Sequence, residues 1–374
     1  MDSRARFTKC HSSLSAALFA AVALGLSGCG SPPPEPGNEP EGDGGSTNDT
    51  PAPDDRPIEH PSNCNYPTRG PQPVVPDLPA SDPRLSAVGI LEQRMEEDNE
   101  KWEPFCTGSL IGMKTVLTAY HCVKGSEGKD VRFRLGSNLK SSMGSPINVL
   151  NSDRDRRSPL DGGYMNQGSD VAIMVLEAEA DGSIEPLDVR ALDMHGVGVD
   201  EPFYGVGYYF QGDGTTPGAR HVAGFTLLAT EGHFFKDGFQ TEENFEQCSV
   251  DARRTPHINA RSLDLRLPAN YDLNTLYTDG QPGFASVEDA YSQELLPGYQ
   301  VWLDDGPGGA QPCKGDSGGP LLRRTEDGLA VYGVLSGSVN LGGSEPSRCG
   351  FGAVYAIIAR ETLAWLQEKR DSRR

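Results

Sequence analysis

The 374-residue sequence lacks features that mark several large classes of protein. It has 33 Lys and Arg against 53 Asp and Glu, and no basic stripe interrupts this acidic balance, which argues against nucleic-acid binding. It contains no Cys-x-x-Cys pair, so a tetrahedral metal site has little support. No segment after the N-terminal leader is apolar enough to cross a membrane. The sequence therefore favours an acidic protein whose folded part lies in water.

Glycine and proline are abundant, with 45 and 29 residues respectively. This composition, together with the absence of long helix-rich stretches, favours many short strands joined by turns. All-β domains built from packed barrels commonly reach about 200–250 residues, so the length permits one large domain with appended segments. We therefore predict an all-β fold.

The N-terminus has the layout of an export signal. Arg4, Arg6 and Lys9 precede an apolar run over about 14–26, which is too short to span a bilayer comfortably. The run ends in Leu-Ser-Gly-Cys at 26–29, which resembles the lipobox of bacterial lipoproteins. We expect residues 1–28 to be a lipoprotein signal peptide and Cys29 to carry the lipid. A plain secretory signal with a chance cysteine is the alternative.

The residues after Cys29 are rich in Pro, Gly, Ser, Asp and Glu and have almost nothing apolar to bury. We predict a disordered linker over 29–62 that tethers a folded domain over 63–374. The domain would then lie outside the cytoplasm, as a membrane-anchored lipoprotein in the periplasm or on the cell surface, or as a secreted protein. Its only membrane contact would be the anchor at Cys29.

Cysteine usage agrees with export. Removal of Cys10 with the signal and lipidation of Cys29 leave an even number of cysteines, which suggests disulfides. Spacing alone does not choose among the 15 pairings that six cysteines allow. The six are Cys64, Cys106, Cys122, Cys248, Cys313 and Cys349.

Two segments carry residues suited to acyl transfer. Residues 106–122 read CTGSLIGMKTVLTAYHC and predict a hairpin that ends at His121, a candidate general base. Residues 312–322 read PCKGDSGGPLL, in which glycines leave Ser317 accessible as a nucleophile. The same loop can direct the backbone N–H groups of Gly315 and Ser317 at an oxygen that gains negative charge.

Together these two motifs resemble the chymotrypsin and trypsin family of serine peptidases, whose triad runs His, Asp, Ser along the chain. The acid must then lie between them. Asp170 opens an apolar stretch at 168–176, GSDVAIMVL, which is similar to the family's aspartate segment; Asp161 is the fallback. The resemblance implies that His121, Asp170 and Ser317 are catalytic.

The resemblance, which covers about 84–370, also implies the architecture. We expect two six-stranded antiparallel Greek-key β-barrels, the first over about 84–200 and the second over about 201–360, followed by a short C-terminal helix near 361–369. The implied activity is peptide-bond hydrolysis through an acyl-enzyme intermediate, on peptide or protein substrates and without a cofactor or metal. We expect a monomer.

The same resemblance implies disulfides Cys106–Cys122 and Cys313–Cys349, which leaves Cys64 and Cys248 for each other. It also implies a substrate pocket near Gln311, Ser336, Ser338 and Ala353. Gln311 occupies the position where trypsin has a negative charge, and Leu335 the position of the histidine expected in glutamyl-specific relatives. We therefore expect a neutral pocket, with Ser336 also corresponding to the family's buried serine near the triad.

The sequence departs from the family at the N-terminus. Family zymogens are cleaved before Ile/Val-x-Gly-Gly, and the new amine pairs with the aspartate before the serine, here Asp316. The string is absent, so another group must satisfy Asp316, because a buried unpaired carboxylate is costly. Either cleavage follows Arg69 or Arg84, or the enzyme is active without processing.

Two other features are less regular. Tyr120 replaces a small residue before the histidine, which we interpret as a packing variation. The segment over about 224–309 is longer than the family needs, so we expect inserted loops around the second barrel.

Two other functions stay open. One is a catalytically silent surface binding protein of the same fold. The other, a general esterase, lacks the expected Gly-x-Ser-x-Gly elbow.

Overall fold

The computed structural model describes residues 77–95, 101–155, 169–194, 202–209, 218–239, 241–248, 288, 291–292, 294–304, 312–313, 315–340 and 350–371. The predicted signal peptide, the lipidated Cys29, the linker and the fallback acid Asp161 lie outside these residues.

The strands of the first barrel bury side chains on one face or on both. In β4 (Val131–Asn138) Val131, Phe133 and Leu135 are buried and the arginines between them are only partly so, which is the period-two pattern of a strand with one face on the core. In β7 (Ala172–Leu176) every residue is buried, so both faces of this barrel strand are covered. The apolar content of these segments thus decides which strands line the core.

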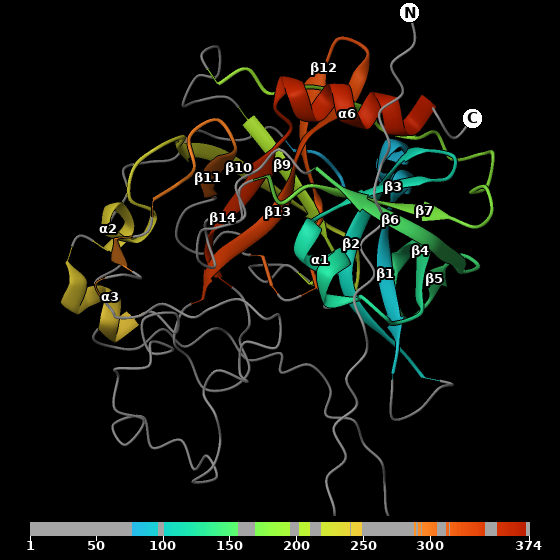
Figure 1. Ribbon diagram of the computed structural model, residues 1–374, viewed down its shortest axis with the longest axis horizontal. Coiled ribbons are helices and arrows are strands. Elements are labelled where there is room, and N and C mark those ends of the chain that lie inside the picture. Colours follow the sequence, from blue (N-terminus) through green and yellow to red (C-terminus); the bar gives the residue numbers. More distant parts are fainter. Residues whose placement is uncertain are drawn as a thin grey trace, which may run out of the picture. The chain divides into compact units, whose positions relative to one another are not determined.

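Six strands close the first barrel in the order β1-β2-β3-β7-β6-β4 (Figure 1). Closure follows from β1, which pairs antiparallel with both β2 and β4. The short β5 pairs with β4 alone. The remaining elements are η1 (Pro83–Ala87), β1 (Val88–Arg94), β2 (Trp102–Gly112), β3 (Thr115–Thr118), α1 (Tyr120–Gly125), β5 (Ser142–Met143) and β6 (Ile147–Arg154).

The second barrel closes in the same way, in the order β12-β9-β10-β11-β14-β13, because β12 also pairs with β13. The two-residue β8 adds a parallel pairing to β13. The chain ends in helix α6 (Figure 1). The elements are β8 (Asp188–Val189), β9 (Pro202–Gly207), β10 (His221–Ala229), β11 (Gln300–Asp304), β12 (Pro320–Thr325), β13 (Gly328–Asn340), β14 (Gly350–Ile357) and α6 (Arg360–Asp371).

The predicted all-β fold with two six-stranded antiparallel barrels and a C-terminal helix is confirmed. The first barrel was predicted to begin at about residue 84, but its first strand, β1, begins at Val88. Residues up to Ala87 form the 3-10 helix η1, because the Asp82 carboxylate accepts a hydrogen bond from the Arg84 amide (3.0 Å) and Pro83 occupies the first turn.

The expected insertion at about 224–309 is narrower than predicted. Its two ends belong to barrel strands β10 and β11. Between them, α2 (Phe234–Phe239) and α3 (Glu242–Cys248) meet through Phe235 and Phe245, whose ring centroids are 4.6 Å apart. Phe239 and Tyr291 pack against Phe245 at 5.5 and 5.6 Å. The inserted part that the structure describes therefore has a small aromatic core of its own.

One predicted disulfide, Cys106–Cys122, is confirmed and joins β2 to α1. Cys313 is also disulfide-bonded. Its expected partner Cys349 lies outside the described residues, as does Cys64, and the side chain of Cys248 is not described. The pairs Cys313–Cys349 and Cys64–Cys248 therefore stay predictions.

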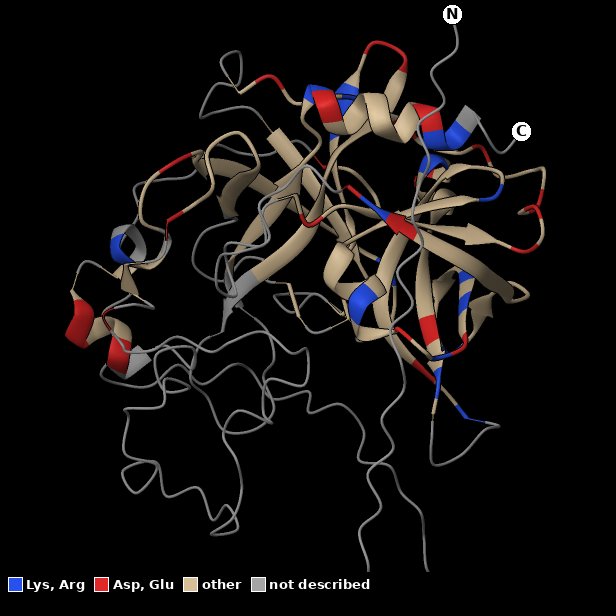
Figure 2. Ribbon diagram, in the orientation of Figure 1, with Lys and Arg blue, Asp and Glu red and all other residues tan. Residues whose placement is uncertain are grey.

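Charged residues on the described ribbons lie mostly in turns, at strand ends and along α6 (Figure 2). Glu92 in β1 is an exception, since it is only 5% exposed. Arg132 and Arg134 on the neighbouring β4 compensate it, at 2.6 and 3.2 Å. Among the helices that the structure describes, none is long and apolar enough to span a bilayer.

Candidate active site

His121 lies in the first turn of α1, where a distant carboxylate supplies the helix cap. The residue before the helix, Ala119, has no side chain that could cap it. Instead the Asp170 backbone carbonyl accepts the Tyr120 amide (3.2 Å), and Asp170 Oδ1 accepts the His121 amide (2.8 Å). The orphan N–H groups of a helix start are thus satisfied by a residue 49 positions later in the chain. This capping fixes His121 relative to Asp170.

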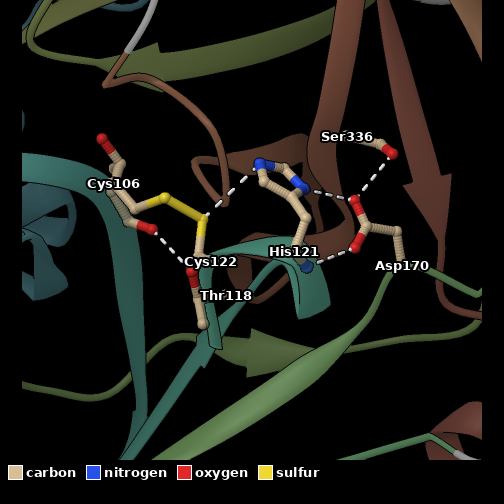
Figure 3. Close-up of polar contacts among 7 residues, drawn as sticks. Cys106, Thr118, His121, Cys122, Asp170 and Ser336 are labelled. Carbon is tan, nitrogen blue, oxygen red and sulfur yellow. Dashed lines mark hydrogen bonds and ion pairs between the residues drawn. A yellow bond between two sulfur atoms is a disulfide. The ribbon is translucent and has the colours of Figure 1, made fainter. Parts of the chain in front are cut away.

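The imidazole of His121 is held by the same carboxylate. His121 Nδ1 lies 2.7 Å from Asp170 Oδ2 (Figure 3). Ser336 Oγ donates to Oδ2 from β13, also at 2.7 Å, and Asp170 is fully buried. A carboxylate accepts hydrogen bonds, so this geometry favours the tautomer with its proton on Nδ1. It leaves Nε2, which lies 3.7 Å from Cys122 Sγ, as the ring nitrogen with a lone pair. The arrangement prepares Nε2 to take up a proton.

The loop that carries Ser317 is fastened to both barrels. Thr107 of β2 donates its amide to the Ser317 carbonyl and its hydroxyl to the Gly315 carbonyl, both at 2.8 Å. From the second barrel, the Leu335 carbonyl accepts the Gly318 amide at 2.8 Å. The loop is therefore held at the junction between β2 and β13.

Glycines in this loop are required by close approach. Gly318 has φ 79°, and a Cβ there would lie 2.1 Å from Thr118 Oγ1. Gly315 has φ 107°, and its Cβ would lie 2.5 Å from the ring of Tyr209. Any larger residue at either position would meet both backbone strain and a collision. The glycines of the serine motif are thus required by the close packing of the loop as well as by access of substrate to Ser317.

Two separate tethers lead from Ser317 back to the His121 and Asp170 pair. The first tether runs through Thr107, whose amide donates to the Ser317 carbonyl. The residue before it, Cys106, is disulfide-bonded to Cys122, which directly follows His121. The second tether runs through Leu335, whose carbonyl accepts the Gly318 amide. The next residue, Ser336, donates its hydroxyl to Asp170. The structure thus brings the backbone of Ser317 beside both segments.

Asp316 is fully buried immediately before Ser317. Its Oδ1 accepts the backbone amides of Tyr208 and Tyr209, both at 2.8 Å, and its Oδ2 accepts the amide of Cys313 at 2.9 Å. Burial raises the pKa of Asp316 to about 7, against the opposing effect of these donors. The group that satisfies Asp316 is thus a set of three amides.

The predicted pocket residues are seen only in part. Ala353 in β14 is fully buried and lies between Leu303 of β11 and Ser338 of β13 in the sheet. The side chain of Ser338 and the whole of Gln311 lie outside what the structure describes. Ser336 bonds to Asp170, so its hydroxyl belongs to the histidine and aspartate cluster.

Sequence reasoning missed Thr107, Tyr208 and Tyr209. Thr107 contributes a backbone amide and a hydroxyl, and the two tyrosines contribute backbone amides. A backbone N–H is present in almost every residue, so no residue type at these positions could signal it. Tyr120, interpreted as a packing variation, lies 4.5 Å from the guanidinium of Arg154 in a cation–π contact.

Potential metal ligands gather at one place among the described residues, where atoms of Cys106, His121 and Cys122 lie close together. Because both sulfurs belong to the disulfide, neither is a thiolate that could bind zinc.

A protein-family model described as trypsin matches residues 93–231 and 297–360, which is more than half of the chain. The chain belongs to the trypsin family. Membership of the trypsin family supports assignment to the hydrolase class of peptidases, whose substrates are peptides or proteins. Among solved structures it is similar to mouse neuropsin, described as a serine protease expressed in the limbic system of the brain. That similarity has 18% identity, a TM-score of 0.45, and coverage of 79% of this chain and 97% of the neuropsin chain.

The trypsin-family match stops at Glu231 and resumes at 297, so it leaves out α2, α3 and the rest of residues 232–296. This gap coincides with the part that has its own aromatic core. The segment is therefore an addition to the family fold rather than a part of either barrel.

We predict that Asp316 makes folding stability decrease with rising pH. Its pKa is about 7 when folded and near 3.8 when exposed, so its contribution is full below about pH 4 and is lost as the pH rises to about 7. This shift corresponds to about 4 kcal/mol. Urea denaturation of wild type and Asp316→Asn between pH 4 and 8 measures it as the difference between the two stability curves.

The buried tyrosines near Asp316 do not titrate over this pH range. Burial raises the pKa of Tyr209 to about 12 and that of Tyr355 well above its ordinary value, so both stay neutral over the range. Other titrating groups act equally in the two proteins and cancel in the difference. Parallel stability curves would contradict the prediction.

Proposed function

We propose that the protein is a serine endopeptidase in which His121, Asp170 and Ser317 form the catalytic triad. The observation that carries this proposal is the buried Asp170 carboxylate, which bonds to the amide and Nδ1 of His121 and to Ser336. Family membership and the two tethers of the Ser317 loop support the third member. All three residue types that the chemistry needs are present in the order of the family's triad.

The proposed reaction proceeds through an acyl-enzyme. His121 Nε2 takes the proton of Ser317 Oγ as that oxygen attacks the substrate's carbonyl carbon. The amides of Gly315 and Ser317 stabilise the oxyanion, and His121 returns the proton to the leaving amine. A water molecule, deprotonated by His121, then attacks the acyl carbon and releases the acid and the serine. Asp170 stays ionised throughout and keeps Nδ1 protonated.

The substrate pocket is proposed to be neutral. The described wall residue, Ala353, is small and fully buried in the paired strands β13 and β14. With Gln311 in place of a charged residue at the predicted base, a Lys or Arg side chain would find no ion pair. We therefore expect cleavage after uncharged residues in a peptide library.

The first prediction from this proposal concerns the nucleophile. Wild-type protein should react covalently with a fluorophosphonate probe, and Ser317→Ala should not, because the probe traps the activated serine. Ser141→Ala, which changes an exposed serine in the turn between β4 and β5, is the matched control and should react like wild type. Mass spectrometry of the labelled peptide identifies the modified residue. Folded wild type that does not react would instead favour the silent binding protein.

The second prediction concerns Asp170. Asp170→Asn should lower kcat by roughly 10⁴, the loss typical of this change in a serine protease, because an amide favours the wrong tautomer of the histidine. KM should change only a few-fold, since Asp170 is buried away from substrate. Steady-state kinetics on a cleaved peptide measure both constants. A loss of less than tenfold would assign the acid role to another residue.

We also propose that the enzyme is exported and anchored by lipid at Cys29, with the linker over 29–62 as a tether. The charged start, the short apolar run and the Leu-Ser-Gly-Cys ending support this. Mass spectrometry of the mature N-terminus in a bacterial host should find a diacylated Cys29. A mature chain that begins elsewhere, without lipid, would favour plain secretion.

A further inference from the structure

The Asp316 carboxylate, next to the proposed nucleophile, already has its hydrogen bonds. A carboxylate has about four acceptor sites. Three are occupied by the amides of Tyr208, Tyr209 and Cys313. Charge-assisted hydrogen bonds from these backbone amides favour the charged form, and burial raises the pKa of Asp316 to about 7, so near neutral pH the group carries less than a full charge to compensate. An amine released by chain cleavage is therefore not required to keep this buried group satisfied.

Tyr208 connects Asp316 to the first barrel. Its amide donates to Asp316, and its hydroxyl lies 2.9 Å from the carbonyl of Val88 and 2.6 Å from that of Gly136. Val88 begins β1 and Gly136 lies in β4, two neighbouring strands of that barrel. Tyr208 is fully buried, so its phenol is held between the two barrels. One residue thus links the start of β1 to the carboxylate beside Ser317.

The chain just before β1 is built into the same junction. Leu78, Leu85 and Ala87 are buried. The guanidinium of Arg220, only 8% exposed as a residue, donates to the carbonyl of Leu85 at 2.7 Å and to that of Ala80 at 2.9 Å. Hydrogen bonds from a charged donor are strong, so Arg220 holds this segment against the chain at the start of β10.

Cleavage after Arg84 would disrupt this arrangement. The amide of Leu85, which would become the new amine, donates to the Asp82 carbonyl at 3.0 Å. The Leu85 side chain is fully buried, and its carbonyl is held by Arg220. Moving the new terminus elsewhere would therefore expose an apolar side chain and leave the buried guanidinium with one fewer acceptor.

We infer that Tyr208 is a positioning residue that, with Asp316, holds the Ser317 loop in its active shape while the chain upstream of Val88 stays uncut. The inference rests on the proposed serine-protease function. In family zymogens the amine freed by cleavage pairs with this aspartate. Here that role is assigned to the three backbone amides that bond to Asp316 and to the docked N-terminal segment, which consists of η1 and residues 77–82. Activity is then set by folding, with no cleavage step.

The first experiment removes both candidate cleavage sites. The full chain carrying Arg69→Gln and Arg84→Gln should react with a fluorophosphonate probe within twofold of the wild-type rate. N-terminal sequencing of labelled wild-type protein should find the chain intact through 77–94. Labelling that begins only after cleavage in this region, and is lost in Ser317→Ala, would overturn the inference but leave the proposed function standing. No labelling of the intact or the cleaved form would remove both.

The second experiment compares two tyrosines. Tyr208→Phe loses the hydroxyl that contacts Val88 and Gly136, whereas the matched control Tyr204→Phe loses a buried hydroxyl whose partner is Arg324 at 3.3 Å. We expect Tyr208→Phe to lower the maximal labelling rate about tenfold with unchanged reversible affinity for the probe, and Tyr204→Phe to stay within twofold.

This split separates positioning from stability. Thermal unfolding of both variants measures their loss of stability. If Tyr208 has only a structural role, Tyr208→Phe will lose stability, but its maximal labelling rate will not change at a temperature where the protein is folded. Equal labelling rates for the two variants would overturn the role of Tyr208. If Tyr208→Phe does not fold, the experiment on the uncut chain still decides whether activity requires cleavage upstream of Val88, and cleavage-dependent labelling there would overturn the inference.

Discussion

The buried carboxylate of Asp170 is the interaction around which the site is organised. It accepts hydrogen bonds from the His121 amide, His121 Nδ1 and Ser336 Oγ, and so gathers three segments that are far apart in the chain. A buried anion requires several donors, because without them its desolvation would destabilise the fold. The need to satisfy this group therefore draws the end of the β2–β3 hairpin and strand β13 together at the junction between the barrels.

A second buried carboxylate, Asp316, does the same for the loop after it. Its three amide donors come from the residues after β9 and from Cys313. Together with the two bonds from Thr107 to the loop, they determine the backbone path through Gly315 and Ser317. The proposed acyl-transfer function needs backbone amides that are oriented before the substrate arrives, and these hydrogen bonds hold the loop that carries the proposed amides.

The two motifs were enough to predict the family, because they combine the residue types that this chemistry requires, and the family resemblance implied the two barrels and the Cys106–Cys122 disulfide. The start of β1 and the extent of the insertion were predicted less well. Strand boundaries at Val88 and around β10 and β11 depend on pairing with distant strands, which local composition does not encode. Asp170 was found through its apolar strand, yet its role as cap of α1 has no local signal.

The sequence by itself determined which side chains are available: a histidine, two aspartates and a serine in the order of a known family, with glycines where the loop has no room for a Cβ. Only the tertiary structure decided what satisfies the buried charges. Asp316 is held by amides of Tyr208, Tyr209 and Cys313, and Arg220 by carbonyls of the segment before β1. Backbone donors and acceptors are the same in nearly every residue, so their use is fixed by where the chain folds and not by what its residues are.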